Sequence, residues 1–224
     1  MRAPSTRAMI AELGVPLAWA RGQVAWRGLA RALPGDGRPV LVLPGFLADD
    51  GTTATLRRTL AAAGYVPHGW ALGRNRGVSQ ALLDAMLARL AAVTRDRPAA
   101  VVGWSLGGLY AREIGKRRPD LVERVVTLGS PFSGDIRANN AWRMYERIAG
   151  HAVDRLPIAA ALAEKPPVPT FALWSARDGI VAPAASRGRT GEADVAIEVA
   201  CRHVGFTSDP AALRAVLEVL RRAV

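Results

Sequence analysis

A serine held between glycines is the first residue in this sequence whose position predicts chemistry. Segment 103–107 reads Gly-Trp-Ser-Leu-Gly and lies between a predicted strand over 99–104 and a predicted helix that ends at 118. A sharp strand-to-helix turn holds its serine out from the chain, and the helix N-terminus offers N–H groups to negative charge. This context predicts that Ser105 is a nucleophile. The alternative is a glycine-rich turn in which the serine is incidental.

A serine hydroxyl needs a base to become a nucleophile, and histidine commonly supplies it. After a serine in such a turn, the acid and the histidine follow in that order. Only His203 follows a plausible acid, and it lies just beyond a predicted strand, unlike His68 and His151. Among the intervening carboxylates, Asp178 directly follows a strand end, where it would fix the imidazole tautomer. The alternative for the Asp-Gly pair at 178–179 is a simple turn.

The negative charge that develops on an attacked carbonyl oxygen needs N–H donors. The main-chain N–H of Leu106, the residue after the serine, is one predicted donor. The second is expected in the loop at 43–47, which follows the first strand. There Gly45 permits a turn and the N–H of Phe46 is the preferred donor. The N–H of Leu47 is the competing candidate.

These residues need a sheet that brings several strand ends together. From residue 39 onward, short apolar runs alternate with helical patterns, which is typical of a parallel sheet covered by helices. We expect one α/β domain over residues 1–224, with an open, mostly parallel sheet of about six strands and helices on both faces. Strands are predicted at 40–43, 65–72, 99–104, 122–128, 169–174 and 195–199, and helices at 52–63, 80–94 and 211–222, besides the helix ending at 118.

Residues 133–166 interrupt this alternation and are predicted to form a short helical cap or lid. An insertion here lies over the C-terminal strand ends, where ligands bind in open α/β sheets. Trp142, Tyr145 and Ile148 recur every third residue, which suits one helix face and predicts the wall of a substrate pocket. A helix that faces the core explains the same stripe. Polar residues within 74–76 and 137–140 either reach the same mouth or are ordinary loop surface.

The N-terminal segment, 1–38, is predicted to be a helical extension of the domain. Residues 5–33 combine arginines with apolar side chains such as Trp26. Glu12 and Pro16 interrupt the apolar run that a secretory signal needs, so we interpret the segment as part of the mature protein. Its composition predicts peripheral contact with a lipid surface. Packing against the body of the domain explains the same pattern.

The composition argues against several other classes of protein. The 30 Lys and Arg residues outnumber the 19 Asp and Glu residues, for a net charge of +11, but they are dispersed, so no nucleic-acid partner is expected. A single cysteine and three scattered histidines predict neither an internal disulfide nor a metal site. No stretch reaches the roughly 20 apolar residues that cross a bilayer. We expect a cytoplasmic location, with secretion or peripheral membrane attachment as alternatives.

Together these motifs resemble those of the α/β-hydrolase superfamily, in particular its small bacterial esterases and lipases. The resemblance covers residues 39–224. It implies an open, mostly parallel sheet with helices on both faces, and acyl transfer to a serine followed by hydrolysis by water. The matching segments are Leu-Pro-Gly-Phe at 43–46, Gly-Trp-Ser-Leu-Gly at 103–107, Gly-Ser-Pro at 129–131, Asp-Gly-Ile-Val at 178–181 and His-Val-Gly-Phe at 203–206.

The resemblance implies a serine hydrolase that cleaves a small-molecule or lipid carboxylic ester without a metal or organic cofactor. Ser105 would attack the acyl carbonyl, His203 would act as base and then as acid, and Asp178 would orient the histidine. The candidate substrate contacts are Leu47, Trp104, Trp142 and Tyr145.

Other functions are open on the same residues. A thioesterase, an acyltransferase or a cofactor-free perhydrolase would use the same three side chains with a different leaving group or acceptor. A protein of another class, which binds a lipid surface or a polyester granule, would keep the hydrolase fold and make its contact through residues 5–33.

Overall fold

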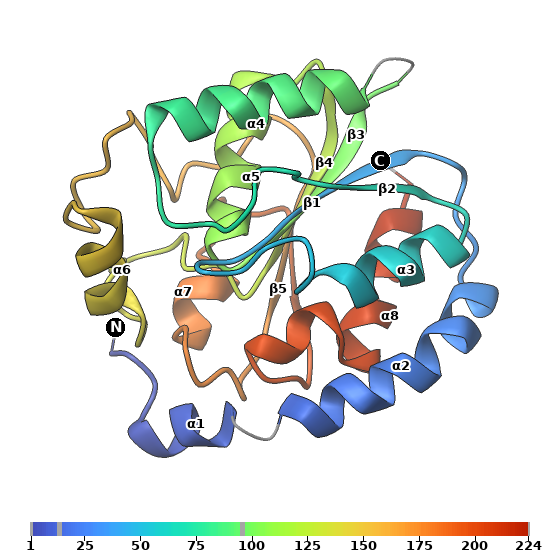
Figure 1. Cartoon of the computed structure of the whole chain (residues 1–224), viewed down its shortest axis with the longest axis horizontal. Coiled ribbons are helices and arrows are strands. Elements are labelled where there is room, and N and C mark those ends of the chain that lie inside the picture. Colours follow the sequence, from blue (N-terminus) through green and yellow to red (C-terminus); the bar gives the residue numbers. More distant parts are fainter. Residues whose placement is uncertain (1, 13–14, 95–96, 224) are drawn as a thin grey trace.

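In the described part of the chain, six strands form one parallel sheet at the centre of the computed structural model (Figure 1). The structure describes residues 2–12, 15–94 and 97–223, and leaves out the side chains of 15–23. The strand order is β2-β1-β3-β4-β5-β6, which confirms the predicted open parallel sheet. The strands are β1 (Pro39–Leu43), β2 (Val66–Gly69), β3 (Ala99–Trp104), β4 (Val122–Leu128), β5 (Thr170–Trp174) and β6 (Val195–Glu198).

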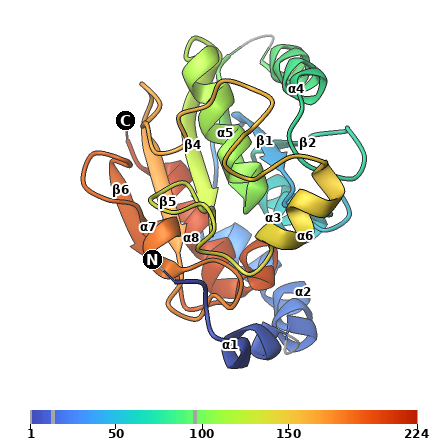
Figure 2. The ribbon, with the colours of Figure 1, turned by 90° about the vertical axis from the view of Figure 1, so that its left-hand side faces the viewer.

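Helices cover both faces of this sheet (Figure 2). The helices of the described residues are α1 (Thr6–Ala11), α2 (Val15–Ala32), α3 (Ala54–Ala62), α4 (Gln80–Val93), α5 (Leu106–Arg117), α6 (Trp142–Ala149), α7 (Pro183–Arg187) and α8 (Pro210–Arg221), with a 3₁₀ helix η2 (Val204–Thr207). Successive side chains of a strand point to opposite faces. Accordingly Val40 and Val42 pack in the core that includes α3 and α8, whereas Leu41 and Leu43 pack in the core that includes α4 and α5.

Because the strands are parallel, the loops after β1, β3, β5 and β6 all leave the sheet at the same edge. Leu43 pairs in register with Gly103 at the ends of β1 and β3. The loop that starts at Pro44 and the turn at Ser105 therefore begin side by side. This arrangement is what gathers the residues predicted to do chemistry.

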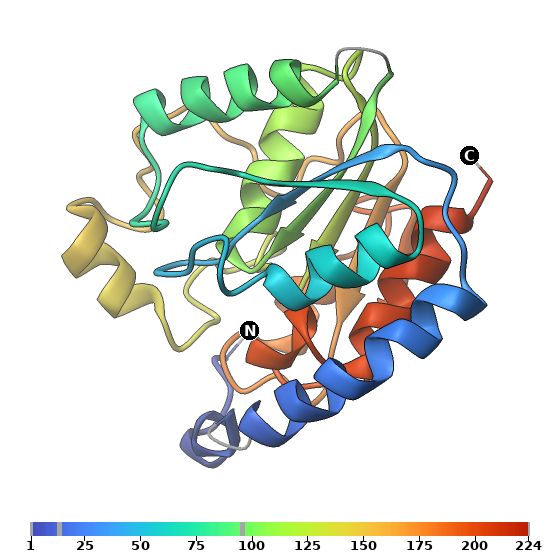
Figure 3. The same cartoon turned by 45° about the vertical axis from the view of Figure 1, so that its right-hand side comes forward.

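The N-terminal extension packs along the body of the domain. Helix α2 lies beside α3 and α8, as the blue, cyan and red helices of Figure 3 show, and its Leu29 and Ala30 are buried in their core. Residues 13–14 of the predicted helical segment lie outside the described residues. Contact of this segment with a lipid surface stays a prediction, with Val24 82% exposed on α2.

Residues 133–166, predicted to form a short helical cap or lid, contain one helix, α6, and are otherwise turns and loops. Gly150 ends α6 in the left-handed conformation, with φ +76°. Beyond Gly150 the segment is not helical, and several of its main-chain carbonyl groups accept hydrogen bonds from positively charged side chains of α5. Lys116 donates to the Ala161 carbonyl at 2.7 Å and Arg117 to the Ala159 carbonyl at 2.7 Å.

Arg112 of α5 is the centre of this attachment. Its fully buried guanidinium lies 4.1 Å from the centre of the Phe132 ring. Burial lowers the pKa of Arg112 to about 10, so the side chain remains charged near neutral pH. Its hydrogen bonds, of 2.9–3.1 Å, run to the carbonyl oxygens of Leu162, Ala163, Glu164 and Glu192.

We expect Arg112→Ala to lower the free energy of unfolding by roughly 3 kcal/mol, because four carbonyl groups lose a charged donor. Arg118, which pairs with Asp120 at the exposed end of the same helix, provides the control. Arg118→Ala should change the stability by less than about 1 kcal/mol. Urea unfolding followed by circular dichroism measures both. Equally small effects would contradict a structural role for Arg112.

Candidate active site

The turn that carries Ser105 has an unusual backbone conformation, with φ +55° and ψ −121°. A positive φ is strained for a residue with a Cβ atom, and such strain typically marks functional sites. The neighbouring glycines make the turn possible. A Cβ atom at position 103 would clash with the Gly107 carbonyl, and one at position 107 with the Leu43 carbonyl. The spacing of the two glycines around Ser105 is therefore a steric requirement.

The structure brings Ser105, His203 and Asp178 together from three separate loops. Nε2 of His203 lies 3.0 Å from Oγ of Ser105, and Nδ1 lies 2.7 Å from Oδ2 of Asp178. The other carboxylate oxygen of Asp178 accepts the N–H groups of Ile180 at 2.9 Å and Val181 at 2.8 Å. Asp178 is 2% exposed and His203 is 4% exposed. These hydrogen bonds hold the buried side chains of Asp178 and His203 in place. We refer to Ser105, His203 and Asp178 together as the relay.

The environment of His203 favours its protonated form. Burial lowers the pKa of the imidazole, but the charge of Asp178, its hydrogen bond and the charge of Glu12 together outweigh burial and raise the pKa above the ordinary 6.5. Because Nδ1 carries its hydrogen and donates a hydrogen bond to the Asp178 carboxylate, Nε2 is left without a hydrogen and can accept the Ser105 hydroxyl proton. The arrangement can activate the serine and hold the proton that it releases.

Among the described residues, neither of the two predicted donors, the main-chain N–H groups of Phe46 and Leu106, has a hydrogen-bond acceptor. Both residues line the same cavity as Ser105. The N–H of Leu47, the competing candidate, donates to the Asn75 carbonyl at 2.7 Å and so is occupied. A Cβ atom on Gly45 would lie 3.1 Å from the Ser105 Cβ, which shows how closely this loop approaches the serine. The arrangement can receive a negatively charged oxygen.

Asn75 holds the loop at 43–47 in place, whereas the sequence suggested that residues 74–76 either reach the mouth of the site or are ordinary loop surface. The side chain is fully buried, and its amide donates to the Pro44 carbonyl at 2.9 Å. Its main-chain N–H donates to the Ala48 carbonyl at 2.8 Å. The hydroxyl of Tyr110 donates to its amide oxygen at 3.3 Å. In the sequence Asn75 is a polar residue between two arginines, and nothing nearby indicated that it is buried and supports the loop at 43–47.

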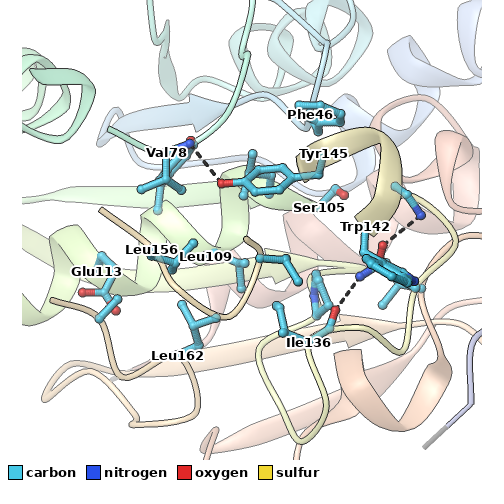
Figure 4. Close-up of a pocket in the computed structure, with 18 of the residues that line it drawn as sticks. Phe46, Val78, Ser105, Leu109, Glu113, Ile136, Trp142, Tyr145, Leu156 and Leu162 are labelled. Atoms are coloured by element: carbon cyan, nitrogen blue, oxygen red, sulfur yellow. Dashed lines mark hydrogen bonds between the residues drawn. The ribbon is translucent and has the colours of Figure 1, made fainter. Parts of the chain in front are cut away.

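An apolar cavity opens beside Ser105 and follows α5 as far as Glu113 (Figure 4). The empty space in this region, which includes open solvent at the mouth, is about 690 Å³. At the far end the Glu113 carboxylate pairs with Lys116 at 2.5 Å. The walls include Phe46, Val78, Leu106, Leu109, Tyr110, Ile136, Trp142, Tyr145, Val153, Leu156, Ile158, Leu162, Ile180 and Val181. A lining of this kind suits an apolar ligand.

The stripe predicted on α6 is correct for two of its three residues. Trp142 and Tyr145 line the cavity, and the Tyr145 hydroxyl accepts the N–H of Val78 at 3.2 Å. Ile148 is 42% exposed and does not line it. A helix turns by about 100° per residue, so every third residue drifts around the axis by about 60°. By the second such step Ile148 has left the buried face.

The other two candidate substrate contacts, Trp104 and Leu47, are not among the residues that line the cavity. Trp104 ends β3 on the opposite face and is buried in the core there, beside Val102. Its indole N–H donates to the His203 carbonyl at 3.0 Å. Alternation along the strand explains this direction, because Trp104 shares its face with Val102. Trp104 thus supports the histidine loop.

Glu12 is a further residue in contact with this region that the sequence did not single out for it. It is 8% exposed, and its carboxylate accepts main-chain N–H groups next to Asp178 and at His203. In the sequence, the only feature that set Glu12 apart was that its carboxylate interrupts the apolar run of the N-terminal segment. The partners lie 167 and 191 residues further along the chain, so no pattern in the sequence could pair them.

The described ranges hold no group of three or more His, Cys, Asp and Glu side chains that could bind a metal ion. Burial raises the pKa of the Cys201 thiol, which disfavours a reactive thiolate. Within the same ranges, no helix combines the length and apolar character needed to cross a membrane.

Comparisons with known proteins identify the fold. No family model and no curated protein matches the sequence. A solved monoacylglycerol lipase from Paleococcus ferrophilus matches with 16% identity and a TM-score of 0.59, over 84% of this chain and 96% of that one. A probable hydrolytic enzyme from Pseudomonas aeruginosa PAO1 matches with 18% identity and a TM-score of 0.60, over 85% of this chain and 87% of that one.

The thioesterase domain from the curacin biosynthetic pathway matches with 14% identity and a TM-score of 0.55, over 84% of this chain and 92% of that one. These likenesses cover most of both chains in each pair. The chain therefore has the α/β-hydrolase fold, as the five motifs predicted.

We expect the pKa of His203, followed by NMR of the imidazole signals, to lie above 6.5. Asp178→Asn should lower it, because burial then acts without the neighbouring carboxylate. Comparison with His203→Ala assigns the signal among the three histidines. A wild-type pKa at or below 6.5, or no change in Asp178→Asn, would contradict the electrostatics described for this site.

Proposed function

We propose that the protein is a serine hydrolase that cleaves carboxylic esters of apolar acids through an acyl-enzyme. The observation that carries this proposal is the hydrogen-bonded relay of Ser105, His203 and Asp178, which opens onto an apolar cavity. The fold is consistent with it, since similar solved structures include a monoacylglycerol lipase and a naproxen esterase from Bacillus subtilis.

In the first half of the reaction, Nε2 of His203 takes the hydroxyl proton as Oγ of Ser105 attacks the acyl carbonyl carbon. The carbonyl oxygen becomes negatively charged and is received by the N–H groups of Phe46 and Leu106. The imidazolium, stabilised by Asp178, then donates its proton to the leaving alcohol oxygen as the carbon–oxygen ester bond breaks. The acyl group remains on Ser105.

In the second half, water takes the place of the alcohol. His203 removes a proton from the water as the water oxygen attacks the acyl carbonyl. Collapse of this second intermediate breaks the bond to Ser105, whose oxygen recovers a proton from the imidazolium. The carboxylic acid leaves and the enzyme returns to its starting state.

The cavity supports an apolar acyl group as the part of the substrate held beside Ser105. Helix α5 rises by about 1.5 Å per residue, so the eight residues from Ser105 to Glu113 span roughly 12 Å. Each methylene that leaves water contributes about 0.8 kcal/mol, or roughly a fourfold gain in kcat/KM when it is bound in the transition state. This favours acyl chains longer than acetyl.

We expect kcat/KM to rise from p-nitrophenyl acetate through the butyrate to the octanoate, and Ser105→Ala to abolish hydrolysis of all three. Leu156→Trp, which places a large ring on the cavity wall between Ser105 and Glu113 (Figure 4), should reduce activity on the octanoate while sparing the acetate. Met144→Trp places the same ring on an exposed position of α6 and should leave the profile unchanged.

Activity that survives Ser105→Ala would contradict the proposed mechanism. Activity that does not depend on chain length would contradict the acyl role of the cavity. Hydrolysis of acyl thioesters, with none of the oxygen esters, would replace the esterase by a thioesterase that uses the same residues.

A further inference from the structure

We propose that Glu12, in the N-terminal extension, is a positioning residue for the hydrolytic relay. Its carboxylate accepts hydrogen bonds from both the loop that carries Asp178 (the acid loop) and the loop that carries His203 (the histidine loop). These bonds hold the His203 ring between Ser105 and Asp178. This inference rests on the proposed function and adds a structural element outside the sheet to it.

The contacts of Glu12 join the two loops through one side chain. Oε1 accepts the N–H of Gly179, next to Asp178, at 2.8 Å and the N–H of His203 itself at 3.0 Å. Oε2 accepts the N–H of Val204 at 3.2 Å. A buried carboxylate with several N–H donors is well satisfied, and such charged hydrogen bonds are stronger than neutral ones. The position of His203 is thus coupled to that of the acid loop.

The acid loop is shaped to receive the N-terminal segment. A Cβ atom on Gly179 would clash with the Ala8 carbonyl of α1, while Gly179 is not among the glycines with positive φ. The absence of a side chain at 179 therefore serves the close approach of α1 rather than the turn. Asn140 adds a second link, because its amide donates to the Pro4 carbonyl at 3.1 Å and to the Gly179 carbonyl at 2.8 Å.

Glu12 also acts on His203 through its charge. The charged groups that raise the pKa of His203 are Asp178, from the loop after β5, and Glu12, from the end of α1. Within its own loop His203 follows Cys201, whose thiol is buried, and Arg202, and Ser105 faces it from the turn after β3. Removing the Glu12 charge takes one of the two anions away from the imidazolium.

These contacts predict a specific effect on the reaction. Glu12 does not line the substrate cavity, so its loss should reduce kcat and leave KM nearly unchanged. Glu12→Gln keeps one acceptor oxygen but loses the charge and the bond to Val204, and should reduce kcat roughly tenfold. Glu12→Ala loses all three bonds and should reduce kcat roughly 100-fold.

The test measures kcat, KM and the pH profile of kcat/KM on p-nitrophenyl butyrate for wild type, Glu12→Gln and Glu12→Ala. In both variants the acid limb of the profile should move to lower pH, because the imidazolium has lost a neighbouring anion. Glu218→Gln, the same substitution at an exposed position of α8, and Ile10→Ala, at an exposed position of α1, are the controls and should match wild type.

A folded Glu12→Gln protein with wild-type kcat and an unmoved acid limb would overturn the proposal. A loss of activity that only follows the fraction of unfolded protein, with the acid limb unchanged, would also overturn it in favour of a purely structural role. Because Glu12→Gln keeps the shape of the side chain, this variant decides the question even where Glu12→Ala fails to fold.

Failure of the proposed function gives a different result. In that case wild type shows no hydrolysis above Ser105→Ala on any ester or thioester. The NMR pKa of His203 then decides on Glu12 by itself. A lower pKa in Glu12→Gln than in wild type supports its coupling to His203, and an unchanged pKa overturns it.

Discussion

Ser105 is held at φ +55°, a conformation that is unfavourable for any residue with a side chain, and the chain around it is built to allow this. Gly103 and Gly107 remove the Cβ atoms that would collide with main-chain carbonyls, and Gly45 lets the neighbouring loop approach the serine. Because β1 and β3 are parallel and Leu43 pairs with Gly103, that loop begins level with the turn that carries Ser105. The Ser105 hydroxyl is thereby fixed at the carboxyl ends of the strands. His203 and Asp178 reach it because the loops after β6 and β5 lie at the same ends.

Those loops are held by buried polar side chains from elsewhere in the chain. Asn75 fastens the loop that carries the free N–H of Phe46, and the indole of Trp104 supports the histidine loop from the other face of the sheet. Glu12 joins the acid and histidine loops, and Arg112 secures the segment that forms one wall of the cavity. Such hydrogen bonds are directional, so they specify loop positions that apolar packing alone would leave adjustable.

The sequence predicted the parts of the molecule that depend on local pattern and order. Apolar runs marked the strands, and a parallel sheet places strand ends together, which is why Ser105 and His203 could be paired across 98 residues. Trp104, a candidate substrate contact, lies instead in the core on the opposite face of the sheet, because the alternation of side chains along the strand sets its direction. Ile148 left the buried face through helical drift. Glu12 could not be found, since its partners are distant in sequence and lack any periodic relation to it.

The central claim is that the relay activates Ser105, and covalent labelling by a fluorophosphonate tests it most directly. The intact mass of wild type should increase by one phosphonyl adduct per chain, carried by the peptide with Ser105, because only an activated serine attacks the phosphorus. Ser105→Ala and His203→Ala should remain unlabelled under the same conditions. A folded wild-type protein that stays unlabelled, with and without detergent, or equal labelling in Ser105→Ala, would contradict the account.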